Sequence, residues 1–83
     1  MILHKQGHLQ EALARFDTKL ALSRKIRDRR AEGVALEELG EVLLDTGKRE
    51  EATTQLTAAR EIFGELGDQA NMKHVDEQFA RLK

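Results

Sequence analysis

The feature that most constrains this chain is an internal repeat with a period of forty residues. When the sequence is shifted by forty positions, identical residues coincide, among them Gly7 with Gly47, Glu11 with Glu51, Ala12 with Ala52, and Asp28 with Asp68. Apolar positions coincide as well, such as Phe16 with Leu56, Leu22 with Ile62, and Ile26 with Leu66. A repeat of this length with two helices in each unit predicts a helical array in which units pack on one another. The paired alanines are therefore expected to lie in similar surroundings.

Apolar residues recur every three or four positions through most of the chain, which is the pattern of amphipathic α-helices. Glycines mark the expected helix ends at 7, 47 and 67, and acidic residues mark the expected N-caps at 28 and 68. These signals predict a short helical piece before Gly7 and helices over about 8–27, 29–46, 48–66 and 68–83. Gly33 falls inside one of them and is expected to weaken it by about 1 kcal/mol relative to Ala. No strand pattern is present.

The 83 residues are enough for one domain. The repeat divides it into a partial repeat over 1–27, a complete repeat over 28–67 and a terminal helix over 68–83. The predicted fold class is all-α, an α-solenoid of antiparallel helical hairpins with about four helices.

The residues of the complete unit resemble the tetratricopeptide repeat family. That family combines large residues, a Leu-Gly pair, and an Ala followed four positions later by an aromatic or large residue. The matching positions in this chain are Leu36, Leu39-Gly40, Leu43, Ala52 and Leu56. Ala12 and Phe16 match the last two positions one unit earlier. The resemblance implies that Gly40, Ala52 and Ala59 are small because the two helices of a unit approach closely there.

The chain departs from that family's pattern in three respects. Leu stands where Trp and Tyr are usual, the proline that ends the second helix is absent, and the period is forty rather than thirty-four. Leu66-Gly67-Asp68 takes the place of the proline turn, as in longer-period arrays found in bacterial regulators and signalling scaffolds. The function that the resemblance implies is a protein–protein interaction module that binds a peptide or partner protein in a concave groove.

In tetratricopeptide arrays the first helix of each hairpin lines that groove. Carried over to this chain, the resemblance assigns to the groove Glu37, Glu38, Glu41, Leu44, Asp45, His74, Glu77, Gln78 and Arg81. The four carboxylates before residue 46 lie off the apolar stripe, so they are expected to be exposed and to attract a basic or mixed-charge peptide. The alternative is an ordinary solvated helix face.

A second hypothesis is self-association. The helix over 8–27 lacks most of its partner in the repeat, so its stripe is expected to be partly bare and to form a homo-oligomer. The stripe consists of Leu9, Leu13, Phe16 and Leu20. The alternative is that the chain is an excised C-terminal fragment of a larger bacterial regulator.

A third hypothesis concerns nucleic acid. Five basic residues, Arg24, Lys25, Arg27, Arg29 and Arg30, gather around the junction between two helices. They could contact phosphates, or they could favour the end of a helix by their charge. The 14 basic and 15 acidic residues give a net charge of −1, which makes nucleic acid an unfavoured partner.

Several classes of function have no signal in the sequence. There is no phosphate-binding glycine loop and no nucleophile with a base at a recognisable spacing, so no enzyme, cofactor or metal site is predicted. Cysteine is absent, which excludes disulfides. No apolar run approaches the roughly 20 residues that span a bilayer, so no membrane partner is predicted. The cytoplasm is the expected location.

Overall fold

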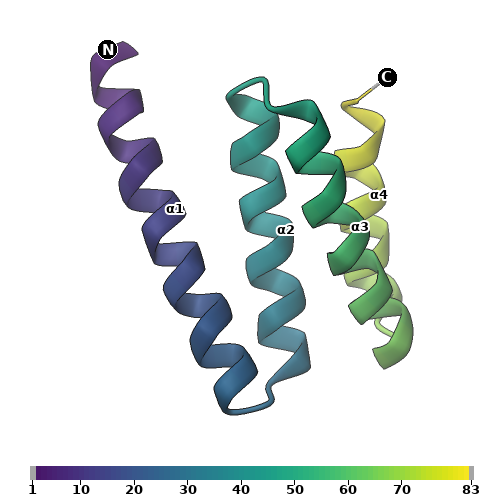
Figure 1. Ribbon diagram of the computed structural model, residues 1–83. Helices are drawn as coiled ribbons and strands as arrows, with labels where there is room; N and C mark the ends of the chain where they lie inside the picture. The colour runs from purple at the N-terminus through teal and green to yellow at the C-terminus, as the bar shows by residue number, and fades with distance from the viewer. Residues whose placement is uncertain (1, 83) are drawn as a thin grey trace.

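The computed structural model describes residues 2–82, with the side chains of residues 8–82. Four α-helices follow one another: α1 (Ile2–Lys25), α2 (Arg29–Asp45), α3 (Arg49–Leu66) and α4 (Gln69–Ala80). They run alternately up and down through the molecule (Figure 1). No residue within 2–82 is in a strand, so the prediction of an all-α chain of four helices is confirmed.

The start of α1 differs from the prediction. Gly7 was expected to end a short helical piece, but α1 continues through it from Ile2 to Lys25. A glycine inside a helix costs only about 1 kcal/mol relative to Ala, so continuous hydrogen bonding along the helix can outweigh it. α1 is therefore one continuous helix.

The three connections between helices share one geometry at intervals of twenty residues. Arg27, Gly47 and Gly67 have positive φ angles of 59°, 80° and 67°. The next residue in each case donates its backbone N–H to a carbonyl five positions earlier, at 2.8, 2.8 and 2.9 Å. These bonds form the Schellman motif that ends a helix. Gly47 and Gly67 were expected there, whereas Arg27 takes a conformation that glycine adopts at less cost.

The two N-caps predicted forty residues apart are confirmed. Asp28 accepts a hydrogen bond from the Ala31 N–H at 3.0 Å, and Asp68 accepts one from the Asn71 N–H at 3.1 Å. The bond from the Asn71 N–H, a second bond from the Asn71 side chain and the ion pair with Arg30 lower the pKa of Asp68. Each aspartate satisfies a free N–H at the start of a helix and so fixes where that helix begins.

Two glycines let α2 and α3 approach each other closely. A β-carbon on Gly40 would lie 2.6 Å from Leu56 Cδ2, and one on Gly33 would lie 2.8 Å from Phe63 Cε1. Both distances are too short for real atoms, so these positions accept only glycine without rearrangement. The buried core around this contact consists of Leu20, Ala35, Leu36, Leu39, Leu43, Ala52, Leu56, Ala59, Ile62, Phe63 and Val75.

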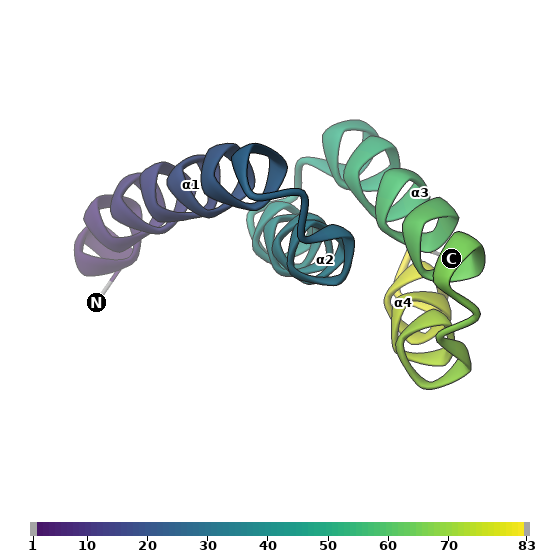
Figure 2. The same ribbon diagram turned by 90° about the horizontal axis from the view of Figure 1, so that it is seen from below.

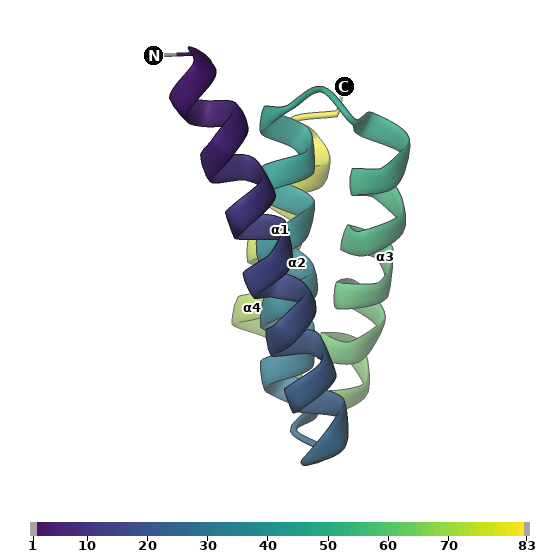
Figure 3. The same ribbon diagram turned by 60° about the vertical axis from the view of Figure 1, so that its left-hand side comes forward.

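α2 is the central helix and contacts the other three. Seen from below, α1 and α3 lie toward one side of the molecule, and α2 and α4 toward the other (Figure 2). The C-terminal end of α1 lies against α2, whereas its N-terminal end leans away from it (Figures 1 and 3). Among the described helices, α1 packs against α2 alone, whereas α3 packs against both α2 and α4.

The two alanines of the repeat do not have the same surroundings. Ala52 is completely buried, whereas Ala12 is half-buried. The difference follows from their helices, because α3 is covered by α2 along the face that contains Ala52, and the corresponding face of α1 has no such cover in residues 2–82. The repeat therefore holds for the turns and caps more closely than for this pair of core positions.

Candidate functional site

A ladder of polar contacts joins α2 to α4 and contains most of the residues predicted to bind a partner. Three acidic residues of α2, one helical turn apart, each meet a polar residue of α4. The pairs are Glu37 with His74, Glu41 with Gln78, and Asp45 with Arg81. The structure brings these six predicted groove residues together, and they contact one another. We call this set the α2–α4 ladder.

The ladder is held by short contacts. Nδ1 of His74 lies 2.5 Å from Oε2 of Glu37, without the direction of a hydrogen bond. Nε2 of Gln78 donates to Oε1 of Glu41 at 2.8 Å, and its own Oε1 accepts from Arg81 at 2.9 Å. Because each acid of α2 has a partner on α4, the ladder fixes the position of α4 on α2.

The burial of Glu37 corrects the expectation that these carboxylates would be exposed. Only 3% of Glu37 is exposed, and only 8% of Gln78. The reason is that α4 packs over the side of α2 that carries Glu37, which the sequence of α2 alone does not reveal. Burial raises the pKa of Glu37, and the neighbouring Glu41 and Glu38 raise it further, while His74 acts in the opposite direction.

The other predicted groove residues lie apart from the ladder. Glu38 is half-buried and forms an ion pair with Lys19 of α1 at 3.7 Å. Leu44 is half-buried and packs against the core. Glu77 is exposed on α4. The predicted acidic strip is thus divided between contacts to α4 and a contact to α1.

The stripe predicted for self-association is only partly bare. Leu20 is 7% exposed and belongs to the core, so the expectation of a bare side chain is wrong at this position. Leu13 and Phe16 are half-buried and pack against the core, and Leu9 is half-buried. The reason is that α2 covers this side of α1, although no second helix of the described residues packs against α1.

An apolar opening with a volume of about 610 Å³ lies between α1 and α2. Leu22 and Ile26 of α1 form one wall, and they are 55% and 61% exposed. Ala31 and Val34 of α2 form the other wall. Charged residues stand around the opening: Lys19, Asp28, Arg30 and Glu38. We call this opening the α1/α2 groove.

A second hollow of about 520 Å³ lies between the same two helices, where α1 leans away from α2. It is lined by His8, Leu9 and Ala12 of α1 and by Val42, Asp45 and Thr46 near the end of α2. The two hollows lie between α1 and α2 at opposite ends of this helix pair.

Sequence reasoning did not identify Leu22 and Ile26 as exposed. It placed them in the apolar stripe of their helix because they coincide with Ile62 and Leu66 in the repeat. Ile62 is 5% exposed, since it packs near Gly33 of α2. The equivalent cover of Ile62 is α2, and among the described residues no helix takes that place beside Leu22.

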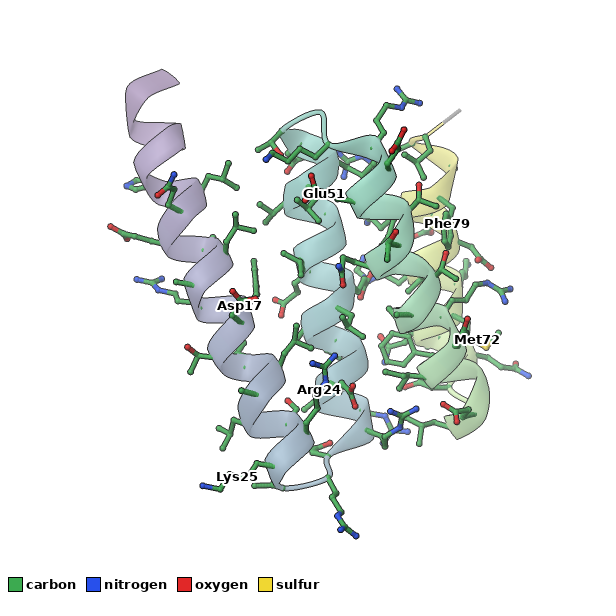
Figure 4. All side chains as sticks on the ribbon, in the orientation of Figure 1. Asp17, Arg24, Lys25, Glu51, Met72 and Phe79 are labelled. Atoms are coloured by element: carbon green, nitrogen blue, oxygen red, sulfur yellow. The ribbon has the colours of Figure 1, made fainter. Side chains whose placement is uncertain are left out.

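The basic cluster is largely neutralised by acidic side chains. Arg24 and Arg29 pair with Glu32 at 2.9 and 3.0 Å, and Arg30 pairs with Asp68 at 3.0 Å. Figure 4 shows Arg24 beside the start of α2 and Lys25 pointing away from the other helices. Arg24 and Arg30 therefore form ion pairs that join helices, a role that neither interpretation of the sequence had given them.

Comparison of this chain with protein-family models, with curated proteins and with solved structures finds no match. Within the described residues no helix has the length and apolar character needed to cross a membrane. Groups of three or more side chains able to hold a metal ion are likewise missing from the part of the chain that the structure describes. The site must accordingly be interpreted from its own geometry.

Proposed function

We propose that this chain is a protein-interaction module that binds a partner protein or peptide and catalyses no reaction. The observation that carries the proposal is the α1/α2 groove, in which Leu22 and Ile26 each leave more than half of their surface in contact with water. Large apolar side chains gathered at an opening with charged residues around it are typical of surfaces that dock a partner.

We further propose that the four helices are arranged as in a tetratricopeptide array. Three features support this arrangement: the alternation of helices between two sides, the repeated turns, and the close contact of Gly40 with Leu56. Ala52 and Ala59, expected at tight positions between helices, are both completely buried.

We propose the α1/α2 groove as the binding surface in preference to the α2–α4 ladder. The acids Glu37, Glu41 and Asp45 already have partners on α4, so a peptide would have to compete with them. Glu38 is the predicted groove residue that also lines the α1/α2 groove. The ladder is better explained as the contact that holds α4 in place.

Site-specific cross-linking tests this proposal. A photoreactive amino acid at position 26 would capture a partner in cells, which is then purified and titrated against the wild-type protein and the Ile26→Glu variant. We expect the variant to lose roughly ten-fold or more in affinity, since an apolar anchor is replaced by a charge. The matched control is Leu66→Glu, the repeat counterpart on α3, which is exposed and lies outside the groove. Equal affinity of wild type and Ile26→Glu would remove the proposal.

Self-association is the second candidate function, because the same exposed apolar residues can meet a second copy of the chain. It predicts a dimer in light scattering at high micromolar concentration that becomes a monomer in Ile26→Glu. The cytoplasmic location and the origin from a longer bacterial regulator stay predictions. Nucleic-acid binding is not proposed, since Arg24, Arg29 and Arg30 are paired with acids.

A further inference from the structure

The repeat indicates what kind of element the α1/α2 groove accommodates. A shift of forty residues places α1 on α3 and α2 on α4. In the second pair the corresponding site is occupied, because α2 itself packs against both α3 and α4. The groove bounded by α1 and α2 is thus the counterpart of the surface of α3 and α4 on which α2 packs. We call each of these two surfaces a seat, and α2 occupies the second one.

The residues of the two seats correspond one by one. On α3, Ile62 and Phe63 lie against Gly33 of α2. Their counterparts on α1 are Leu22 and Ser23, and both line the groove. A helix in the groove would therefore present a small residue to Leu22, as α2 presents Gly33 to Ile62.

The second small residue follows from the same correspondence. Gly40 of α2 lies against Leu56, whose counterpart on α1 is Phe16. A helix in the same pose would carry two small residues seven positions apart, and both would face α1.

The charges on α2, which forms the other wall of the groove, indicate which charges a bound helix would have. In the occupied seat Gln78 and Arg81 of α4 meet the acids Glu41 and Asp45 of α2. The counterparts of Gln78 and Arg81 are Glu38 and Glu41, both acidic. Glu38 already pairs with Lys19 at 3.7 Å, and Glu41 accepts a hydrogen bond from Gln78 at 2.8 Å. A basic residue where α2 has Glu41 or Asp45 would share these acids with the contacts that they already make, whereas an acid there would be repelled, so basic residues are favoured.

Two other positions can be assigned in the same way. Arg30 of α2 pairs with Asp68, whose counterpart Asp28 lines the groove, so a basic residue is favoured there as well. Glu37 of α2 meets His74, whose counterpart is Val34, so an apolar residue is favoured at that place.

We propose that the α1/α2 groove binds an amphipathic helix of a partner protein, in the pose that α2 takes on α3 and α4. This helix has two small residues seven positions apart on the face toward α1 and basic residues along the edge toward Asp28, Glu38 and Glu41. The inference rests on the proposed function and adds the identity of the bound element.

A second copy of the chain fits this seat less well. α4 is the helix of a second copy that corresponds to α2, but the counterparts of Gly33 and Leu36 on α4 are Lys73 and Asp76, which are exposed and charged. The matching face of α2 is already buried against α3. Neither helix offers the small and apolar face that the groove requires.

Two synthetic peptides test the inference. Both have the sequence of α2 (Arg29–Asp45) with Glu37→Leu, and one of them also has Glu41→Lys and Asp45→Lys. Fluorescence anisotropy of the labelled peptides measures their binding to the intact protein. We expect the lysine peptide to bind roughly ten-fold more tightly than the peptide that keeps both acids, because two repulsions between carboxylates are removed and each lysine is attracted by an acid of α2.

Protein variants locate the binding. Ile26→Glu should abolish binding of the lysine peptide, and Leu66→Glu should leave it unchanged. If the attraction were only electrostatic, the added carboxylate of Ile26→Glu would strengthen binding, which would overturn the inference. Glu38→Lys should abolish most of the preference, because each peptide then meets one charge of the same sign and one of the opposite sign.

Three further outcomes would also count against a partner helix as the occupant of the α1/α2 groove. Equal affinity of the two peptides would remove the charge argument. If neither peptide binds while a cross-linked partner still depends on Ile26, the helix is the wrong occupant and the proposed function stands. If light scattering shows a dimer that Ile26→Glu abolishes, the occupant is a second copy.

Discussion

Gly40 of α2 lies against Leu56 of α3 at a distance that leaves no room for a side chain. A β-carbon on residue 40 would stand 2.6 Å from Cδ2 and 2.7 Å from Cγ of Leu56. Leu56 is completely buried, so its side chain cannot swing out into solvent to make room. The separation of α2 and α3 is therefore set by the absence of one methyl group.

The first prediction is that Gly40→Ala destabilises the protein. Alanine favours a helix by about 1 kcal/mol over glycine, but overpacking against a buried leucine costs about 1–3 kcal/mol. We expect a net loss of about 1 kcal/mol in the free energy of unfolding, measured by urea denaturation. Gly64→Ala is the matched control, because a β-carbon there meets nothing within 4 Å. That variant should gain stability, and a gain of equal size in Gly40→Ala would contradict the packing argument.

The second prediction concerns Gly33, which a sequence pattern presents only as a weakness in the helix. Its β-carbon would lie 2.8 and 2.9 Å from two atoms of the Phe63 ring. Gly33→Ala should therefore destabilise the wild-type protein but cost less in a Phe63→Leu background, where the ring atoms are gone. A double-mutant cycle measures the difference as a coupling energy. Additive effects of the two substitutions would show that the ring does not limit this position.

The third prediction compares two repeat counterparts. Ile62→Ala removes a side chain that is 5% exposed and should cost about 2–5 kcal/mol in the free energy of unfolding. Leu22→Ala removes one that is 55% exposed and should change that free energy by only about 0.5 kcal/mol. Chemical denaturation of both variants at low protein concentration checks this. A cost for Leu22→Ala as large as that for Ile62→Ala would mean that Leu22 is covered in solution.

The fourth prediction is a pH dependence that arises from Glu37. Its pKa is raised in the folded protein, chiefly by burial, so the folded state binds the proton of the Glu37 carboxyl group more tightly than the unfolded chain does. The contribution of Glu37 to stability is therefore most favourable below its unfolded pKa of about 4.3 and declines as pH rises through the folded pKa. Glu37→Gln should remove this decline, so its stability relative to wild type should increase with pH across that window.

Urea denaturation at a series of pH values gives the test for Glu37. Glu77→Gln serves as the control, since it neutralises an exposed carboxylate on α4. Parallel pH profiles for wild type and Glu37→Gln would show that burial of this carboxylate has no energetic effect.

The helices could be predicted from the sequence because their signals are local. Asp28 and Asp68 cap helices through residues three positions ahead, and Gly47 and Gly67 end them through bonds within six residues. The prediction that Gly7 ends a helix was wrong because it, too, used only the local sequence. A glycine ends a helix only when the chain on both sides favours a reversal, and that context lies outside the local pattern.

The candidate site could be predicted only in part. The repeat placed Glu41, Asp45 and the polar residues of α4 on one side of the array, but it did not predict that they contact one another. The burial of Glu37 and the exposure of Leu22 depend on how many helices surround α2 and α1. That number is a property of the packed assembly, and helical periodicity within one segment does not contain it.

The shared geometry of the three connections has a consequence for how such a gene can change. Because Asp28 and Asp68 occupy the same place in identical reversals, a stretch of DNA that encodes the forty positions between them begins and ends at equivalent joints. Copying or deleting that stretch would rejoin the polypeptide without altering the phase of any helix. Evolution can thus lengthen or shorten this architecture in whole modules by simple recombination.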